Sequence, residues 1–232
     1  MRQHLIFDAD DTLWENNIYF EEAFDRFCEY LDHSALTPPA IRERLDAIER
    51  ENAKIHGYGA RNFARNLQQC YQLLAERDWE DEHLSEVAEF AHNILDSPME
   101  LIPGVAETLA DLAQHHELTL FTKGDPEEQN MKIDRSGLRI HFDHCAVVKE
   151  KNREAYLRLA DIRDFDLDRT WMIGNSPKSD INPALAAGMR AVYVPHPRTW
   201  GLEKEEISEA GGKLVVIEQF SSLRDVFLPC TE

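Results

Sequence analysis

Short apolar runs alternate with amphipathic stretches along most of this chain. The runs are residues 5–7, 118–122, 145–148, 171–173, 191–194 and 215–217. Apolar runs of this length, bounded by polar or glycine-containing segments, predict buried strands. The stretches between them carry apolar residues at helical spacing, as with Val105, Leu109 and Leu112. Strands that alternate with helices predict an α/β protein with a parallel sheet covered on both faces.

The segment between the first two predicted strands departs from this alternation, because it consists almost entirely of helical patterns. Thr37 before two prolines predicts a helix start with threonine as N-cap, and residues 56–59, which contain two glycines, predict a break. A helical block inside a strand-and-helix pattern is most simply an inserted domain. We therefore expect a core of residues 1–14 and 99–232, and a helical domain of residues 15–98.

Charge and composition exclude several classes of protein. The 232 residues include 44 acidic and 25 basic side chains, which gives a formal charge of −19. Nucleic-acid and anionic-membrane binding both need a basic surface, so neither partner is expected. No apolar run approaches the roughly 18 residues of a membrane span, and the three apolar residues near the N-terminus are too few for a signal peptide.

The four cysteines point to a reducing compartment. Cys28, Cys70, Cys145 and Cys230 are far apart and form no paired motif, so no zinc site or redox site is predicted. We expect reduced thiols in a cytoplasmic protein.

Polar residues gather where the predicted strands end, and in an open parallel sheet ligands bind at that edge. The residues concerned are Asp8, Asp10, Asp11, Thr12, Thr122, Lys123, Lys149, Lys151, Asn175, Ser176 and Asp180. Carboxylates, lysines, a hydroxyl and an amide together suit an oxyanion held with a hard divalent cation.

Asp8 and Asp10 are two residues apart on an extended segment, so their side chains project to the same side. Two such carboxylates repel each other unless a cation neutralises them or one holds a proton. Magnesium binding suits the pair. A division of the chemistry also suits it, with one carboxylate as nucleophile and the other as general acid and then base. A solvated turn is the alternative. An EF-hand is excluded, because Leu13 and Tyr19 stand where glycine and glutamate are required.

Four segments follow one another in a specific order: the DxDxT sequence of residues 8–12, Thr122 at a strand end, a lysine best matched by Lys151, and residues 173–181. This ordered set resembles the haloacid dehalogenase-like (HAD) hydrolase superfamily, in its C1-capped phosphatase branch. The resemblance spans the chain and implies a Rossmann-like parallel sheet core with an inserted α-helical cap domain. Residues 14–17 and 98–103 would be its hinges, and the cap would exclude water and help to select the substrate.

The resemblance also implies roles. Asp8 would attack phosphorus, and Asp10 would protonate the leaving oxygen and then deprotonate water. The phosphate would be bound by Thr122, Lys123 and Lys151. Mg²⁺ would bind Asp8, the Asp10 backbone carbonyl, Asn175 and Asp180.

The sequence leaves two assignments open. The family usually has an acidic residue at Asn175, so either Asn175 or Asp180 is the direct metal ligand. Lys149 competes with Lys151 for the role of motif lysine.

The resulting hypothesis is a magnesium-dependent phosphatase that cleaves a small phosphomonoester through an aspartyl-phosphate. A dehalogenase needs neither a metal nor an acid at Asp10, so these residues disfavour it. The alternatives are a phosphomutase and a non-catalytic ligand-binding or regulatory member of the same fold. The expected partner is a small phosphorylated metabolite, and the pattern predicts neither its identity nor the oligomeric state.

Overall fold

The computed structural model describes residues 2–229, which divide into two compact units. Residues 2–15 and 99–229 form the unit that we call the core unit, and Asn16–Pro98 form the helical unit. No helix within residues 2–229 is long and apolar enough to cross a membrane.

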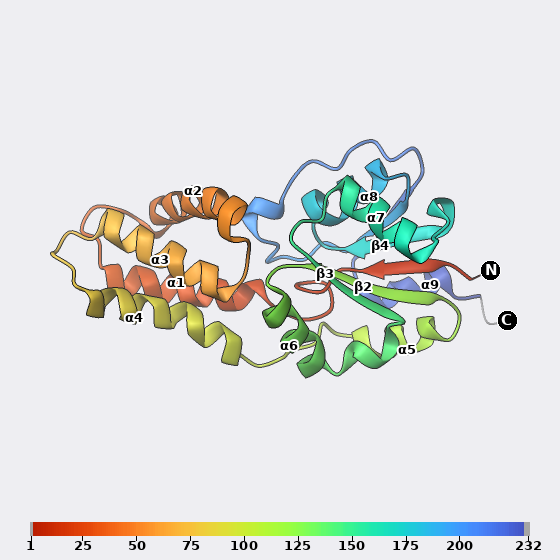
Figure 1. Ribbon diagram of the computed structural model, residues 1–232, viewed down its shortest axis with the longest axis horizontal. Coiled ribbons are helices and arrows are strands. Elements are labelled where there is room, and N and C mark those ends of the chain that lie inside the picture. Colours follow the sequence, from red (N-terminus) through yellow and green to blue (C-terminus); the bar gives the residue numbers. More distant parts are fainter. Residues whose placement is uncertain (1, 230–232) are drawn as a thin grey trace. The chain divides into compact units, whose positions relative to one another are not determined.

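The core unit contains a six-stranded sheet in which every neighbouring pair of strands is parallel (Figure 1). The strands are β1 (His4–Phe7), β2 (Glu117–Lys123), β3 (His144–Val148), β4 (Thr170–Gly174), β5 (Arg190–Tyr193) and β6 (Leu214–Val216). Their order, β3-β2-β1-β4-β5-β6, confirms the predicted α/β fold. The order reverses around β1, and this switch point is where such sheets bind ligands, beyond the carboxyl ends of the strands.

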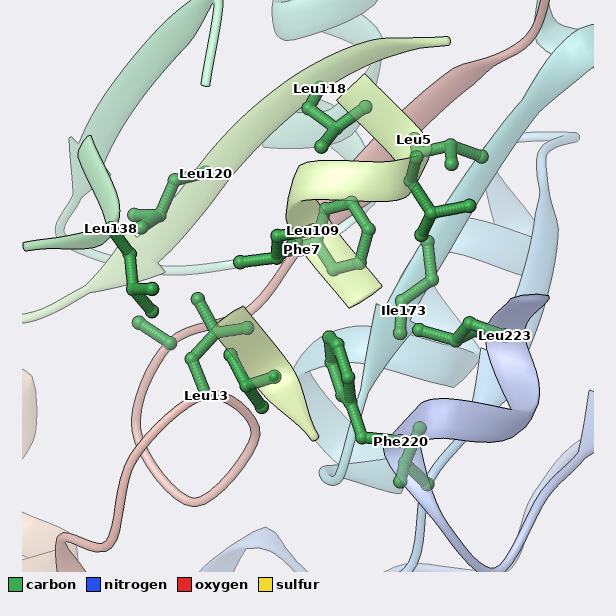
Figure 2. Packing of buried hydrophobic residues seen from close by; sticks show 14 of the residues in the cluster. Leu5, Phe7, Leu13, Leu109, Leu118, Leu120, Leu138, Ile173, Phe220 and Leu223 are labelled. Carbon is green, nitrogen blue, oxygen red and sulfur yellow. The ribbon is translucent and has the colours of Figure 1, made fainter. Parts of the chain in front are cut away.

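Alternation along the strands sends neighbouring residues to opposite faces of the sheet. Leu5 and Phe7 of β1 pack on one face with α5 (Val105–Ala113), α6 (Pro126–Ser136) and α9 (Leu223–Phe227). Figure 2 shows Leu109 and Leu223 of this layer beside strand residues Phe7 and Ile173.

The other face is smaller and receives the intervening strand residues. Ile6 and Met172 pack there with α7 (Arg153–Arg163) and α8 (Asn182–Ala186). The wholly buried Tyr156 of α7 contacts Phe121 edge to face, with 5.2 Å between ring centroids. Helices therefore cover both faces of the sheet, and the polar residues lie at the edge formed by the carboxyl ends of its strands.

The helical unit has a hydrophobic core of its own, formed by four helices. They are α1 (Asn17–Leu31), α2 (Pro38–His56), α3 (Ala60–Leu74) and α4 (Asp81–His92), followed by a 3₁₀ turn, Asn93–Asp96. Phe27, Leu45, Leu67 and Val87 contribute one wholly buried side chain from each helix.

The predicted helix start is confirmed, with Thr37 as N-cap and prolines in the first turn of α2. Thr37 is the N-cap of α2, but its side chain makes no capping hydrogen bond. An N-cap hydroxyl accepts from the N–H of the second or third helical residue, and Pro39 at the second position has none, which leaves Ala40 as the one donor of this kind.

The cysteines within the described residues are free thiols. Burial raises the pKa of Cys28 to about 11 and that of Cys70 to about 12, so neither is a reactive thiolate near neutral pH. Cys145 is also free, and Cys230 lies outside the described residues.

Candidate active site

The loop after β1 carries the first group of polar residues. The Asp8 N–H donates to the Ile173 carbonyl of β4 at 2.9 Å, which continues the sheet for one residue past β1. The loop then turns back on itself. Leu13 N–H donates to the Ala9 carbonyl at 2.8 Å, and Asp11 adopts a positive φ of 60°. The side chains of Ala9 and Leu13 are fully buried. They anchor the loop while its carboxylates stay at the sheet edge.

Lys151, which precedes α7, joins Asp8 to a second carboxylate. Its ammonium donates to Asp8 Oδ1 and, at 2.6 Å, to Asp180 Oδ1. All three residues are buried, with Asp180 at 0% exposure. Burial by itself would lower the pKa of Lys151, but the carboxylates of Asp180 and Asp8 outweigh it and raise that pKa above its usual range. Lys151 therefore stays charged and offsets the repulsion between two buried acids.

Asp180 is seated tightly behind this lysine. It belongs to the π-helical turn Pro177–Ile181 after β4, and its Oδ2 accepts from the Ser176 N–H at 2.9 Å. A Cβ built on Gly174 would lie 2.3 Å from that same oxygen, so only glycine permits this approach.

The carboxyl of Asp180 is strongly perturbed. Burial raises its pKa to about 7, and the nearby Asp8 carboxylate adds to the increase, while Lys151 and the Ser176 N–H oppose it. The group thus gains its charge near neutral pH, in contrast to an exposed aspartate.

Thr12 links the first loop to the segment after β4. Its hydroxyl lies 2.9 Å from Asp8 Oδ2 and 3.2 Å from Asn175 Oδ1. The Asn175 amide donates to the Thr199 hydroxyl at 3.0 Å, which fixes the carbonyl oxygen toward Thr12. A carboxylate oxygen and an amide oxygen therefore flank a single hydroxyl.

Asp10 lies in a separate group of contacts. Its Oδ1 accepts from the Trp14 indole N–H at 2.8 Å, and its Oδ2 accepts from the Gln129 amide at 2.9 Å. The Lys132 ammonium contacts both oxygens, at 3.1 and 3.0 Å. Burial would raise the pKa of Asp10, but Lys132, Gln129 and Trp14 together bring it below its usual value.

The end of β2 supplies the expected threonine and its neighbour. The Thr122 hydroxyl is buried and lies 3.5 Å from Gln129 Oε1. The Lys123 ammonium contacts Glu203 Oε1 at 2.6 Å and Ser179 Oγ at 2.9 Å. Its charge is thus directed to a carboxylate of the same sheet edge.

The two lysines considered for the motif have different surroundings. Lys151 is buried against Asp8 and Asp180, whereas Lys149 is exposed. The sequence-based interpretation missed Trp14, which it placed in a linker although the residue is wholly buried, and also Gln129, Lys132 and Glu203. The helical spacing of Gln129 and Lys132 just after Thr122 was the available signal, because i and i+3 share a helix face.

A second acidic group flanks the loop. Ligand atoms of Asp11, Glu15 and His196 lie within 4.8 Å of one another, and His196 Nε2 is 3.4 Å from Glu15 Oε1. Arg198 Nη1 is 3.9 Å from the other oxygen of Glu15. This geometry is compatible with a structural role for His196 in its loop.

The oxygen atoms beside Asp8 suit a hard divalent cation. Asp8 Oδ2 and Asn175 Oδ1 are oxygen donors of the kind that Mg²⁺ prefers, and both converge on Thr12. The two oxygens of Asp180 already bond Lys151 and the Ser176 N–H. The donor set therefore fits magnesium with Asn175 in place of a charged ligand.

Comparison with known families assigns this chain to one of them. A family model for haloacid dehalogenase-like hydrolases matches residues 3–188. This chain belongs to that family. The match runs from β1 through the residues that follow α8, so it contains every segment that meets at Asp8.

Individual relatives are more distant. The chain is 24% identical over 239 residues to a glyceraldehyde 3-phosphate phosphatase of Methanothermobacter thermautotrophicus, covering 97% of this chain and all of that protein. It is 23% identical over 201 residues to the pyrimidine 5′-nucleotidase YjjG of Escherichia coli, covering 82% and 84%. A haloacid dehalogenase-like family hydrolase from Xanthomonas campestris has a similar structure, with a TM-score of 0.84, 32% identity, and coverage of 97% and 90%.

Proposed function

We propose that this HAD-like hydrolase is a magnesium-dependent phosphatase of the C1-capped branch, acting on a small phosphomonoester. One observation carries the proposal: the buried ammonium of Lys151 bonds both Asp8 and Asp180, next to the Thr12 hydroxyl shared by Asp8 and Asn175. Burying two carboxylates close together costs free energy. Proteins do so where a nucleophile and a charged substrate must be held. The phosphatase and nucleotidase among the relatives support the same reaction class.

Each side chain has a proposed role. An Asp8 oxygen attacks phosphorus, and the bond from phosphorus to the leaving oxygen breaks as that oxygen takes a proton from Asp10. The same Asp10 then accepts a proton from water, which attacks the aspartyl-phosphate and releases phosphate. Thr122 holds a phosphoryl oxygen, and Lys151 balances the negative charge that accumulates on Asp8 and the phosphoryl group. Lys123, paired with Glu203 at 2.6 Å, would need to leave that partner to reach phosphate.

Magnesium would be held by Asp8, the Asp10 backbone carbonyl and Asn175, with Asp180 as the charge partner of Lys151. When bound, it would supply positive charge beside the phosphoryl oxygens. The helical unit is proposed to act as the cap that helps to select the substrate.

Dehalogenation is the rival reaction that the family name suggests. It needs a carboxylate nucleophile but no proton for its halide leaving group. Three donor side chains hold Asp10 in place. Because dehalogenation does not use a second carboxylate as a proton donor, this arrangement favours phosphate chemistry.

The test is hydrolysis of para-nitrophenyl phosphate by the full chain, with magnesium and with a chelator. We expect turnover that requires magnesium and is lost in D8N. Absence of turnover under both conditions, with release of chloride from 2-chloropropionate, would reassign the enzyme as a dehalogenase. Binding of phosphorylated compounds without turnover would indicate a regulatory protein.

A further inference from the structure

The carboxylate of Asp10 has an unusually complete set of donors. Two donors meet each of its oxygens: Trp14 and Lys132 at Oδ1, Gln129 and Lys132 at Oδ2, all between 2.8 and 3.1 Å. An ionised carboxylate offers about four lone-pair positions, so these contacts use all of them. The group is therefore fixed in both position and orientation.

Two of the donors come from the same face of α6. Gln129 and Lys132 are three residues apart on this helix, and both are buried, at 3% and 8% exposure. The helix start is itself well defined, because the Asp125 side chain accepts from the N–H groups of Glu127 and Glu128 at 3.0 Å. A rigid helix rather than a flexible loop thus presents the two side chains to Asp10.

The segment before the helix is adapted to this arrangement. Gly124 has a φ of 146°, and a Cβ there would lie 2.9 Å from Gln129 Nε2, the atom that donates to Asp10. Any larger residue would displace Gln129 from its acceptor. Thr122, two residues earlier, lies 3.5 Å from the other end of the same amide, so Gln129 connects the threonine to Asp10.

Stability alone is a weak explanation for this lysine. A buried ion pair loses most of its attraction to the cost of removing both charges from water, and apolar residues of similar size usually stabilise a fold as well. The Lys132 ammonium also lies 3.9 Å from Glu128, so it has a second carboxylate within reach and still binds Asp10 at 3.0 Å. The contact is better explained by what it does to Asp10.

We propose that Lys132 and Gln129 are positioning residues that hold the Asp10 carboxyl for proton transfer to the leaving oxygen. This inference rests on the proposed phosphatase function. When the leaving oxygen takes the proton from Asp10, a carboxylate is left behind, and the ammonium and the amide stabilise that product of the transfer. The four donor contacts suit the ionised carboxyl, and one of them opens when Asp10 binds the proton that it transfers.

The experiment compares two substrates of similar size whose leaving groups differ in their need for a proton. Para-nitrophenolate departs without protonation, whereas the benzyl alkoxide of benzyl phosphate does not. General acid catalysis is worth about 10²–10⁴-fold. We expect K132M to lower kcat/KM for benzyl phosphate by about tenfold or more beyond its effect on para-nitrophenyl phosphate, with K132R restoring most of the loss.

Two further variants serve as controls. R139M removes an exposed cation that pairs with Asp134 on the surface of the same region, and it should leave the ratio of the two substrates unchanged. In a D10N background, K132M should not change the ratio further, because the group that it positions is gone.

The outcomes are distinguishable. Equal losses on both substrates in K132M would overturn the positioning role while leaving the phosphatase assignment intact. Failure of the wild-type protein to hydrolyse either substrate would instead remove the proposed function. If K132M does not fold by circular dichroism, Q129M tests the same carboxylate, and an unchanged substrate ratio in that variant would also overturn the proposal.

Discussion

Asp8 and Asp10 are two residues apart, yet each lies in different surroundings and meets its own lysine. Lys151, before α7, bridges Asp8 to a second buried carboxylate, Asp180. Lys132, from α6, contacts both oxygens of Asp10 at 3.0–3.1 Å and lies 3.9 Å from Glu128, while neutral donors complete the set around Asp10. The first lysine offsets repulsion between two acids, and the second completes the donor set of one. A contact between aspartate and lysine therefore balances charge at Asp8 and fixes the orientation of the carboxylate at Asp10.

Removing the bridging lysine gives the largest expected effect. K151M leaves Asp8 and Asp180 as buried carboxylates with no cation between them, and breaking a buried pair in this way costs about 3–5 kcal/mol of unfolding free energy. Catalysis should fall about 100-fold or more, because a preorganised positive charge at the phosphoryl group is lost. Urea unfolding and steady-state kinetics measure the two effects.

The neighbouring lysine provides the matched control for this variant. Lys149 is exposed, and K149M should change the unfolding free energy by less than about 0.5 kcal/mol. Equal effects of K149M and K151M on stability and rate would contradict the distinction between the two lysines.

Titration of Asp180 should appear in the stability of the metal-free protein. Its pKa is about 7 in the folded state, against about 3.9 for an aspartate in an unfolded chain. A raised folded pKa means that the folded state binds this proton more tightly. The resulting stability is complete below about pH 4 and is lost as the pH rises through 7.

The measurement is urea unfolding of the wild type and D180N in the presence of a chelator. We expect the wild type to lose a few kcal/mol relative to D180N between pH 4 and 7, since one pKa unit corresponds to about 1.4 kcal/mol. A difference between the two proteins that is constant with pH, or that grows in favour of the wild type as the pH rises, would show that Asp180 is not perturbed in this way.

The smallest effect concerns the neutral amide near Asp8. N175D adds a charged oxygen where Asn175 faces Thr12, so the magnesium concentration for half-maximal activity should fall about tenfold. Calorimetric titration with magnesium alone checks the same change without turnover. An unchanged affinity would indicate that Asn175 is not a ligand.

The pattern of the sequence predicted the sheet and its polar edge more completely than the contacts at that edge. Short apolar runs such as residues 5–7 predict buried strands from local composition alone. The order of the motifs along the chain identified Asp8, Thr122 and Lys151. Which side chains contact each other at this edge depends on residues far apart in the sequence. Asp10 and Lys132 are 122 residues apart, and nothing local to either side chain specifies that they meet.

Two further features illustrate the same limit. Trp14 follows the DxDxT segment and resembles a linker residue by position, but the turn of the loop directs its indole back to Asp10. Lys123 has the expected location for a phosphate-binding group, but Glu203, which is 80 residues away, holds its ammonium. Each depends on a loop whose path the local sequence does not determine.

The proposed reaction begins with Asp8 as the nucleophile. The measurement is acid quench of the wild-type enzyme during turnover of para-nitrophenyl phosphate with magnesium, followed by peptide mass spectrometry. We expect one phosphoryl group on the peptide that contains Asp8, at that residue, and none in D8N. Turnover with the phosphoryl group on a different residue, or turnover that persists in D8N, would contradict it.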